Sequence, residues 1–206
     1  MTLRLVVATA NPDKAREIRE VLAGAGLDIE LVARPADVPE VVEDGVTLLD
    51  NARLKARALR DATGLAAIAD DTGLEVDALD GAPGVFSARY AGPDATYADN
   101  CAHLLAELDR VGATDRSARF ATSIVLALPD GSELDARGEV EGVILDHARG
   151  DGGFGYDPVF VPSDGDGSSF AEMTAAEKHA VSHRGRALRA MAERMWESLP
   201  SARSQE

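Results

Sequence analysis

The chain has 206 residues, of which 36 are acidic and 21 basic, giving a formal net charge of −15. Such acidity argues against broad binding to DNA, RNA or anionic lipid, because that affinity depends on a basic surface. There is no signal-peptide pattern and no apolar run near the ~18 residues that a membrane helix needs, and the single cysteine, Cys101, permits no intrachain disulfide. We therefore expect a soluble cytoplasmic protein, with Cys101 as a small, semi-buried helix residue rather than a catalytic thiol.

The first predicted unit is a buried strand at 3–8 followed by a helix that begins after Asn11 and ends before Gly24. Asn11 can cap this helix, and Pro12 suits its first position. Free backbone N–H groups and the positive end of the helix dipole would then point at one spot, which favours phosphate. The segment Thr9–Lys14 lacks the P-loop pattern, so an ordinary capped helix is the alternative.

A second strand is predicted at 28–33, an acidic connector at 40–45 and a helix at about 50–63. The next strand, 65–69, is expected to end in a turn at 70–73, since Asp, Thr and Gly all favour turns.

Asp70 and Asp71 would then lie at the edge of a sheet, where ligands usually bind in α/β folds. Mg²⁺ prefers oxygen ligands and needs only one or two carboxylates besides substrate phosphates. Neighbouring residues in extended chain point in opposite directions, so one of the two aspartates is expected to be structural. Glu40 or Glu43 could supply a second carboxylate, with a solvated acidic loop as the alternative.

The second half of the chain mixes strands and helices around turn-rich segments. The predicted elements are a short strand near 74–78, turns at 80–92, a helix at 96–111, a hairpin of 117–128 and 133–140, a helix from 174, a helix at 184–199 and a frayed tail at 201–206. These elements predict a single α/β domain over residues 1–200, built around a mixed sheet.

The loop 152–160 combines flexible glycines with two aromatic rings and one carboxylate. Phe154 and Tyr156 could offer stacking surfaces to a flat ligand, although a glycine-rich turn between strands is the alternative. Lys178 and the pair His183-Arg184 could hold phosphate or a base carbonyl, although single cations on helices are more often on the surface.

Seven motifs in one order resemble the inosine triphosphate pyrophosphatase family, the pyrophosphatases of non-canonical purine nucleoside triphosphates. The likeness spans about residues 3–199, and its motifs are Thr9–Lys14, Asn51–Ala56, Ala69–Gly73, Gly81–Gly84, Ser87–Tyr90, Gly152–Pro158 and Ser182–Arg184.

The resemblance implies a twisted mixed sheet with flanking helices, forming two lobes around a central nucleotide-binding cleft, and a homodimer. It also implies Mg²⁺-dependent hydrolysis of ITP, dITP and XTP to the monophosphate and pyrophosphate. Two alternatives remain open: a house-cleaning pyrophosphatase for modified pyrimidine nucleotides, and a non-catalytic nucleotide sensor.

Carried over by motif, Asp71 and Lys55 are the expected catalytic residues, and the metal would bind Asp71 with Glu40 or Glu43. Ala10 departs from the glycine often found in the family. The expected substrate-binding residues are Thr9, Ala10, Asn11, Pro12, Asp13, Lys14, Asn51, Thr72, Phe154, Gly155, Tyr156, Asp157, Lys178, His183 and Arg184. Base selection would rest on donors to the purine 6-carbonyl, for which His183, Arg184 or backbone N–H groups are the candidates.

Overall fold

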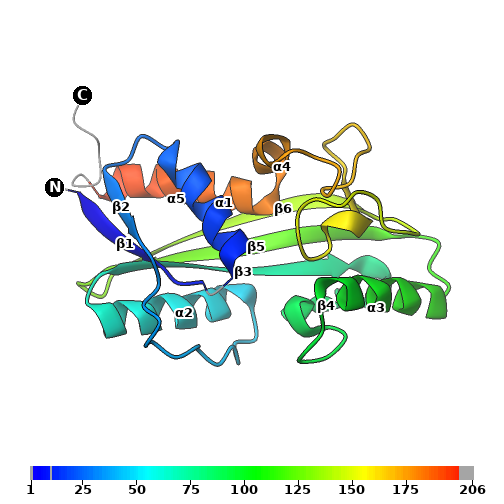
Figure 1. Ribbon diagram of the computed structural model, residues 1–206, viewed down its shortest axis with the longest axis horizontal. Coiled ribbons are helices and arrows are strands. Elements are labelled where there is room, and N and C mark those ends of the chain that lie inside the picture. Colours follow the sequence, from blue (N-terminus) through cyan, green and yellow to red (C-terminus); the bar gives the residue numbers. More distant parts are fainter. Residues whose placement is uncertain (1, 10, 200–206) are drawn as a thin grey trace. The chain divides into compact units, whose positions relative to one another are not determined.

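The computed structural model describes residues 2–9 and 11–199, so the predicted tail at 201–206 lies outside the described residues. Among these residues, the regular elements are β1 (Leu3–Val7), α1 (Pro12–Ala23), β2 (Ile29–Val32), α2 (Leu48–Thr63), β3 (Ala66–Val76), β4 (Pro83–Gly84), α3 (Tyr97–Arg110), β5 (Ser117–Ala127), β6 (Glu133–Ile144), β7 (Phe160–Pro162), α4 (Ala175–Val181) and α5 (His183–Ser198), with short 3₁₀ turns at Asp77–Leu79, Ser87–Arg89 and Asp157–Val159. The strands form a seven-stranded sheet in the order β2-β1-β3-β5-β6-β7, with β4 also paired to β3 (Figure 1). The α/β class is therefore confirmed.

The sheet is mixed, as predicted. Strand β1 pairs in parallel with β2 and β3, whereas β4 pairs antiparallel with β3 and β7 antiparallel with β6. The predicted helices are confirmed, with α2 beginning two residues early because Thr47 caps it, and Gly64 ends it in the left-handed conformation.

One prediction about the backbone was wrong. The expected turn at 70–73 does not exist, because β3 runs without interruption from Ala66 to Val76. Burial on both faces of the sheet outweighed the turn propensity of these residues, because most of β3 is buried, including Asp70 and Asp71.

The chain divides into two compact units. Of the described residues, unit 1 comprises 2–9, 11–71, 122–138 and 185–199, and unit 2 comprises 72–121 and 139–184. In unit 1, α2 covers one face of the sheet while α1 and α5 cover the other (Figure 1). The two-residue period of the strands separates their side chains between these layers.

Strands β1 and β3 show this separation clearly. Leu5 and Ile68 belong to the hydrophobic core under α1 and α5, while Val6 and Ala67 belong to the core under α2. The side chains of β3 from Ala66 to Ala69 thus pack alternately into the two cores. The same alternation determines where Asp70 and Asp71 point.

Unit 2 has its own hydrophobic core. Helix α3 contributes Cys101, Leu104 and Leu108, which pack with Phe120 and Phe160 in one cluster. Cys101 lies on a helix, as predicted, and is buried rather than semi-buried.

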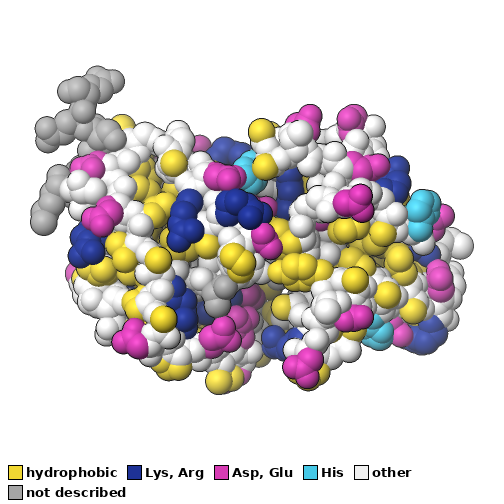
Figure 2. Space-filling model, viewed as in Figure 1, with side chains coloured by type: hydrophobic (Ala, Val, Ile, Leu, Met, Phe, Trp, Pro, Cys, Tyr) yellow, Lys and Arg dark blue, Asp and Glu magenta, His cyan; other side chains and the backbone are white. Residues whose placement is uncertain are grey.

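On the face seen in Figure 2, acidic and basic side chains are interspersed, in keeping with the spread of charge along the sequence. Among the described helices, none is both long and apolar enough to cross a membrane.

Candidate active site

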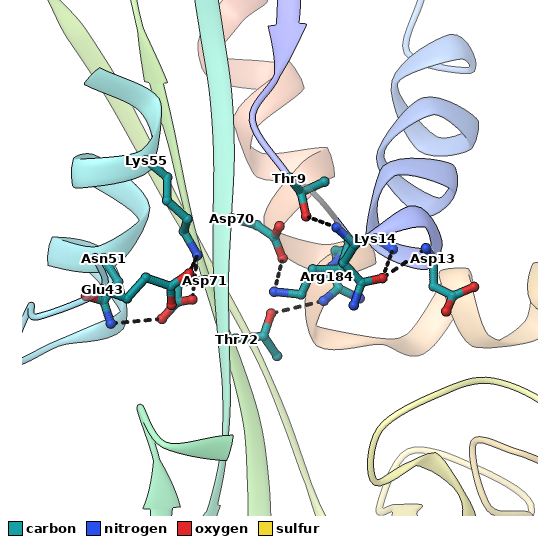
Figure 3. Close-up of polar contacts among 11 residues, drawn as sticks. Thr9, Asp13, Lys14, Glu43, Asn51, Lys55, Asp70, Asp71, Thr72 and Arg184 are labelled. Carbon is teal, nitrogen blue, oxygen red and sulfur yellow. Dashed lines mark hydrogen bonds and ion pairs between the residues drawn. The ribbon is translucent and has the colours of Figure 1, made fainter. Parts of the chain in front are cut away.

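Two consecutive aspartates of β3 point to opposite faces of the sheet in unit 1. Asp70 continues the alternation of Ala66 and Ile68, and its Oδ2 lies 3.3 Å from Nζ of Lys14 on α1. Asp71 continues the alternation of Ala67 and Ala69 and faces α2 (Figure 3). Both carboxylates are buried. The predicted opposite orientation is confirmed, and each carboxylate has a lysine partner.

Helix α2 presents two residues to Asp71. Asn51 and Lys55 are four residues apart and so share one helix face. Lys55 Nζ lies 2.7 Å from Asp71 Oδ1 and 3.2 Å from Glu43 Oε1, while Asn51 Nδ2 donates to Asp71 Oδ2 at 3.4 Å. The structure therefore brings two carboxylates to one ammonium group. We call Lys14, Glu43, Lys55, Asp70 and Asp71 the charged cluster.

The two candidate metal-binding glutamates differ in position. Glu43 is half-buried against Lys55, whereas Glu40 is exposed and makes no ion pair or hydrogen bond within the described ranges. Among the described residues, no three His, Cys, Asp or Glu side chains gather as a metal site. The carboxylates of Glu43 and Asp71 nevertheless form a donor set that would suit Mg²⁺, because this ion needs only one or two carboxylates beside water and phosphate oxygens.

Burial and charge act against each other in this cluster. Burial raises the pKa of the Asp71 carboxyl above its ordinary value, although Lys55 and Lys14 pull it back. Burial alone would lower the pKa of Lys55, but the carboxylates of Asp71, Asp70 and Glu43 outweigh it and raise that pKa. Lys55 is thus held in its charged form beside a carboxylate of increased basicity.

The start of α1 differs from the predicted phosphate site in one respect. Asn11 Oδ1 accepts hydrogen bonds from the backbone N–H groups of Asp13 and Lys14, so these two donors already cap the helix. Asp13 pairs with Arg16 on its own helix, and the Asn11 N–H donates to Thr9 Oγ1. The one positively charged side chain of the segment 9–14 is that of Lys14, which is paired with Asp70. Exposed Pro12 has no N–H to offer, and Ala10 lies outside the described residues.

In unit 2, Asp157 organises the glycine-rich loop. Its Oδ2 accepts from the Phe154 N–H at 2.7 Å and from Lys178 Nζ at 2.7 Å, and both Asp157 and Lys178 are buried. Gly153 adopts a positive φ of 69°, and a Cβ at this position would collide with the Asp157 carboxylate. The neighbouring Gly155 also has positive φ, 64°.

The two aromatic residues of this loop have different surroundings. Phe154 is half-buried, with Lys178 Nζ 4.5 Å and Arg184 Cζ 5.4 Å from its ring centroid. Tyr156 is buried, and its hydroxyl donates to the Ser87 carbonyl at 2.9 Å. This burial argues against a stacking role for Tyr156 and leaves Phe154 as the candidate.

His183 and Arg184 are also buried, contrary to the surface alternative. The His183 ring stacks on Phe120, with centroids 4.5 Å apart and planes 16° apart, and Arg184 Nη2 donates to Thr72 Oγ1 at 3.1 Å. Phe120 is not predictable from the sequence as part of this set, because a single aromatic residue in a strand does not reveal its partner. We call Phe120, Phe154, Asp157, Lys178, His183 and Arg184 the aromatic set.

Known proteins are similar to this chain in both sequence and fold. Residues 5–194 match the Ham1 family. A Streptomyces coelicolor protein named dITP/XTP pyrophosphatase is 49% identical over 190 residues, covering 91% of this chain and 94% of its own. The structure of a HAM1 protein from Coxiella burnetii matches with a TM-score of 0.87 and 40% identity, covering 96% of this chain and 100% of that one.

A third match combines structure with a named activity. A Mycobacterium abscessus crystal structure, described as a nucleoside-triphosphatase or dITP/XTP pyrophosphatase, has a TM-score of 0.73 and 46% identity, covering 92% of this chain and 97% of its own. The family match spans most of the chain, and these relatives cover it nearly from end to end. The chain belongs to the Ham1 family.

Proposed function

We propose that this protein hydrolyses ITP, dITP and XTP to the nucleoside monophosphate and pyrophosphate, with Mg²⁺ as its cofactor. Family membership and relatives named dITP/XTP pyrophosphatase support the reaction class. The observation that carries the proposal is the position of Lys55, whose Nζ lies within 3.2 Å of a carboxylate oxygen of both Glu43 and the buried Asp71. A lysine and two carboxylates in this arrangement suit a triphosphate and its metal ion.

The charged cluster would bind the triphosphate. Lys14 and Lys55 supply positive charge near the phosphates, which lowers the cost of the negative charge in the transition state. Glu43 and Asp71 are the residues that would hold Mg²⁺, which when bound draws charge from the phosphate oxygens. Asp70 holds Lys14 by their ion pair and therefore serves as its positioning partner.

Asp71 would also orient the attacking water and accept its proton. The water oxygen bonds to the α-phosphorus, the α–β bridging bond breaks, and pyrophosphate leaves. A carboxyl group whose pKa is raised by burial is a better proton acceptor than an exposed one, which suits this role.

The aromatic set would bind the base. Phe154 offers a ring for stacking, while Lys178 and Arg184 are cationic donors beside that ring. A donor aimed at the purine 6-carbonyl is left facing an amino group when adenine enters, and a mismatch of this kind can cost ~10⁴-fold in selectivity. Buried donors therefore favour hypoxanthine and xanthine over adenine.

A homodimer in the cytoplasm belongs to the same proposal. Its support is the resemblance to the family and, for the compartment, the single buried cysteine. Size-exclusion chromatography with light scattering tests the association state.

Steady-state hydrolysis of a nucleotide panel tests the function. The protein with saturating Mg²⁺ is given ITP, XTP, GTP, ATP, dTTP and UTP separately, and the rates are compared. We expect rapid turnover of ITP and XTP with little of ATP and GTP. Preference for dTTP or UTP would favour the pyrimidine alternative, and binding without turnover would favour the sensor.

A further inference from the structure

We propose that Asn51 is a positioning residue for the metal-binding carboxylates, and that Gly45 provides the space it needs. This inference rests on the proposed function. It replaces the expectation that Asn51 contacts substrate. Asn51 is only 1% exposed, and its side-chain amide is hydrogen-bonded to the Gly45 backbone on one side and to the Asp71 carboxylate on the other.

The two ends of the Asn51 amide have different partners. Oδ1 accepts from the backbone N–H of Gly45 at 2.8 Å, and Nδ2 donates to Asp71 Oδ2 at 3.4 Å. A backbone N–H requires an acceptor and a carboxylate requires a donor, so these partners determine which end of the amide faces each. Asn51 thus connects the acidic connector to β3 through one side chain.

Gly45 permits this approach by having no side chain. A Cβ at Gly45 would lie 2.6 Å from Asn51 Oδ1 and 2.7 Å from Asp50 Cβ. Both distances are below those that real Cβ atoms adopt, so any larger residue must displace the connector. Gly45 is two residues from Glu43, and displacement there would move the Glu43 carboxylate relative to Lys55.

Asn51 therefore acts on both candidate metal ligands at once. It holds Asp71 directly by a hydrogen bond and holds Glu43 indirectly through Gly45. Each Asp71 oxygen has two lone pairs, so its bonds to Asn51 and Lys55 leave capacity for a metal ion. Groups that orient metal ligands in this way typically change metal affinity or activity by about 10- to 100-fold when removed.

Asn51→Ala tests the proposal, and Asn100→Ala is its matched control. Asn100 is likewise a buried helix asparagine, 2% exposed, and its amide accepts from Ala91 N–H and donates to the Ala88 carbonyl. It contacts backbone alone in these bonds, so its loss removes similar hydrogen bonds without touching a carboxylate of the charged cluster.

The readout is Mn²⁺ affinity, measured by electron paramagnetic resonance with an ITP analogue whose α–β bridge cannot be hydrolysed. We expect Asn51→Ala to weaken Mn²⁺ binding about 10- to 100-fold and Asn100→Ala to leave it within about twofold of wild type. Melting temperatures report the structural cost of each change. Equal Mn²⁺ affinity in Asn51→Ala and wild type, or an equal loss in both variants, would overturn the proposal.

Gly45→Ala provides a second test that leaves the hydrophobic cores intact. Gly24→Ala is its control, because a Cβ there meets only Val21 O at an ordinary 3.7 Å. We expect Gly45→Ala to weaken Mn²⁺ binding and Gly24→Ala to leave it unchanged. Wild-type binding in both glycine variants would contradict the inference. A wild-type protein that binds Mn²⁺ but hydrolyses no nucleotide would refute the proposed function without refuting Asn51's role.

Discussion

The charged cluster of unit 1 and the aromatic set of unit 2 surround their buried charged side chains in different ways. In unit 1, the buried aspartates of β3 pair with Lys14 and Lys55 on helices that cover opposite faces of the sheet. In unit 2, a single carboxylate, Asp157, accepts from both a loop N–H and Lys178, and the rings of Phe154 and Phe120 lie against Lys178 and His183.

This difference suggests a division of labour. Paired lysines and carboxylates, one of them a carboxyl group with a raised pKa, suit phosphate chemistry. Aromatic rings and buried donors suit discrimination between flat bases. Changes in the charged cluster should therefore reduce turnover of every nucleotide, while changes in the aromatic set should alter affinity or preference.

The largest expected effect is that of Asp71→Asn. We expect turnover of ITP to fall by about 10²- to 10⁴-fold, the usual contribution of a general base. Folding should be little affected, because burial already disfavours the charged form of Asp71 and the amide is isosteric. Pyrophosphate release and thermal melting measure the two effects. Asp135→Asn, a half-exposed carboxylate of unit 1, is the control, and wild-type turnover in Asp71→Asn would refute the assigned role.

Arg184→Met should change base preference. Loss of a hydrogen bond from a charged donor costs ~1.5–3 kcal/mol, so we expect the ratio of kcat/KM for ITP to that for ATP to fall by roughly 10- to 100-fold. Arg189→Met, at an exposed position of the same helix, should leave the ratio unchanged. A uniform loss for both nucleotides would assign Arg184 to phosphate binding instead.

Phe154→Leu should weaken binding without changing preference. Stacking on an aromatic ring contributes ~1–3 kcal/mol per base, so KM for ITP and XTP should rise together by about tenfold. Phe86→Leu is the matched control, since Phe86 also lies against an arginine, Arg89, but is 57% exposed. A selective loss of one purine would show that Phe154 reads the base edge rather than its face.

The smallest expected effect concerns Cys101. Burial, with a contribution from Asp157, raises the pKa of its thiol from 9.0 to about 11. The unfolded chain would ionise first, so this thiol's contribution to stability is complete below pH 9 and is lost as pH rises through 11. At pH 10 the loss should be about 1 kcal/mol relative to Cys101→Ala. Chemical denaturation at pH 8 and 10 measures it, and parallel pH profiles of the two proteins would contradict the shifted pKa.

Much of the fold could be predicted from local pattern. Asn11 and Pro12 start α1 as expected, Gly64 ends α2, and the turn after Leu128 joins β5 to β6. The expected turn after Ala69 failed because local propensity does not register burial on both faces of a sheet.

For the candidate site, the sequence offers residue types but not their arrangement. The two-residue period of a strand predicts that Asp70 and Asp71 point to opposite faces. It does not predict that Lys14 and Lys55 form ion pairs with them. The choice between Glu40 and Glu43 depends on the path of an irregular connector. The sequence also predicts Tyr156 as a stacking ring, because it does not show that the Tyr156 hydroxyl donates to the carbonyl of Ser87, 69 residues away.

Phosphorus NMR of the products of ITP hydrolysis tests the central claim most directly. The wild-type protein with Mg²⁺ should convert ITP to IMP and pyrophosphate in one step, with no IDP at any time, and Asp71→Asn should form the same products about 10²- to 10⁴-fold more slowly. Appearance of IDP and orthophosphate would place the cleavage at the β–γ bond and contradict the account.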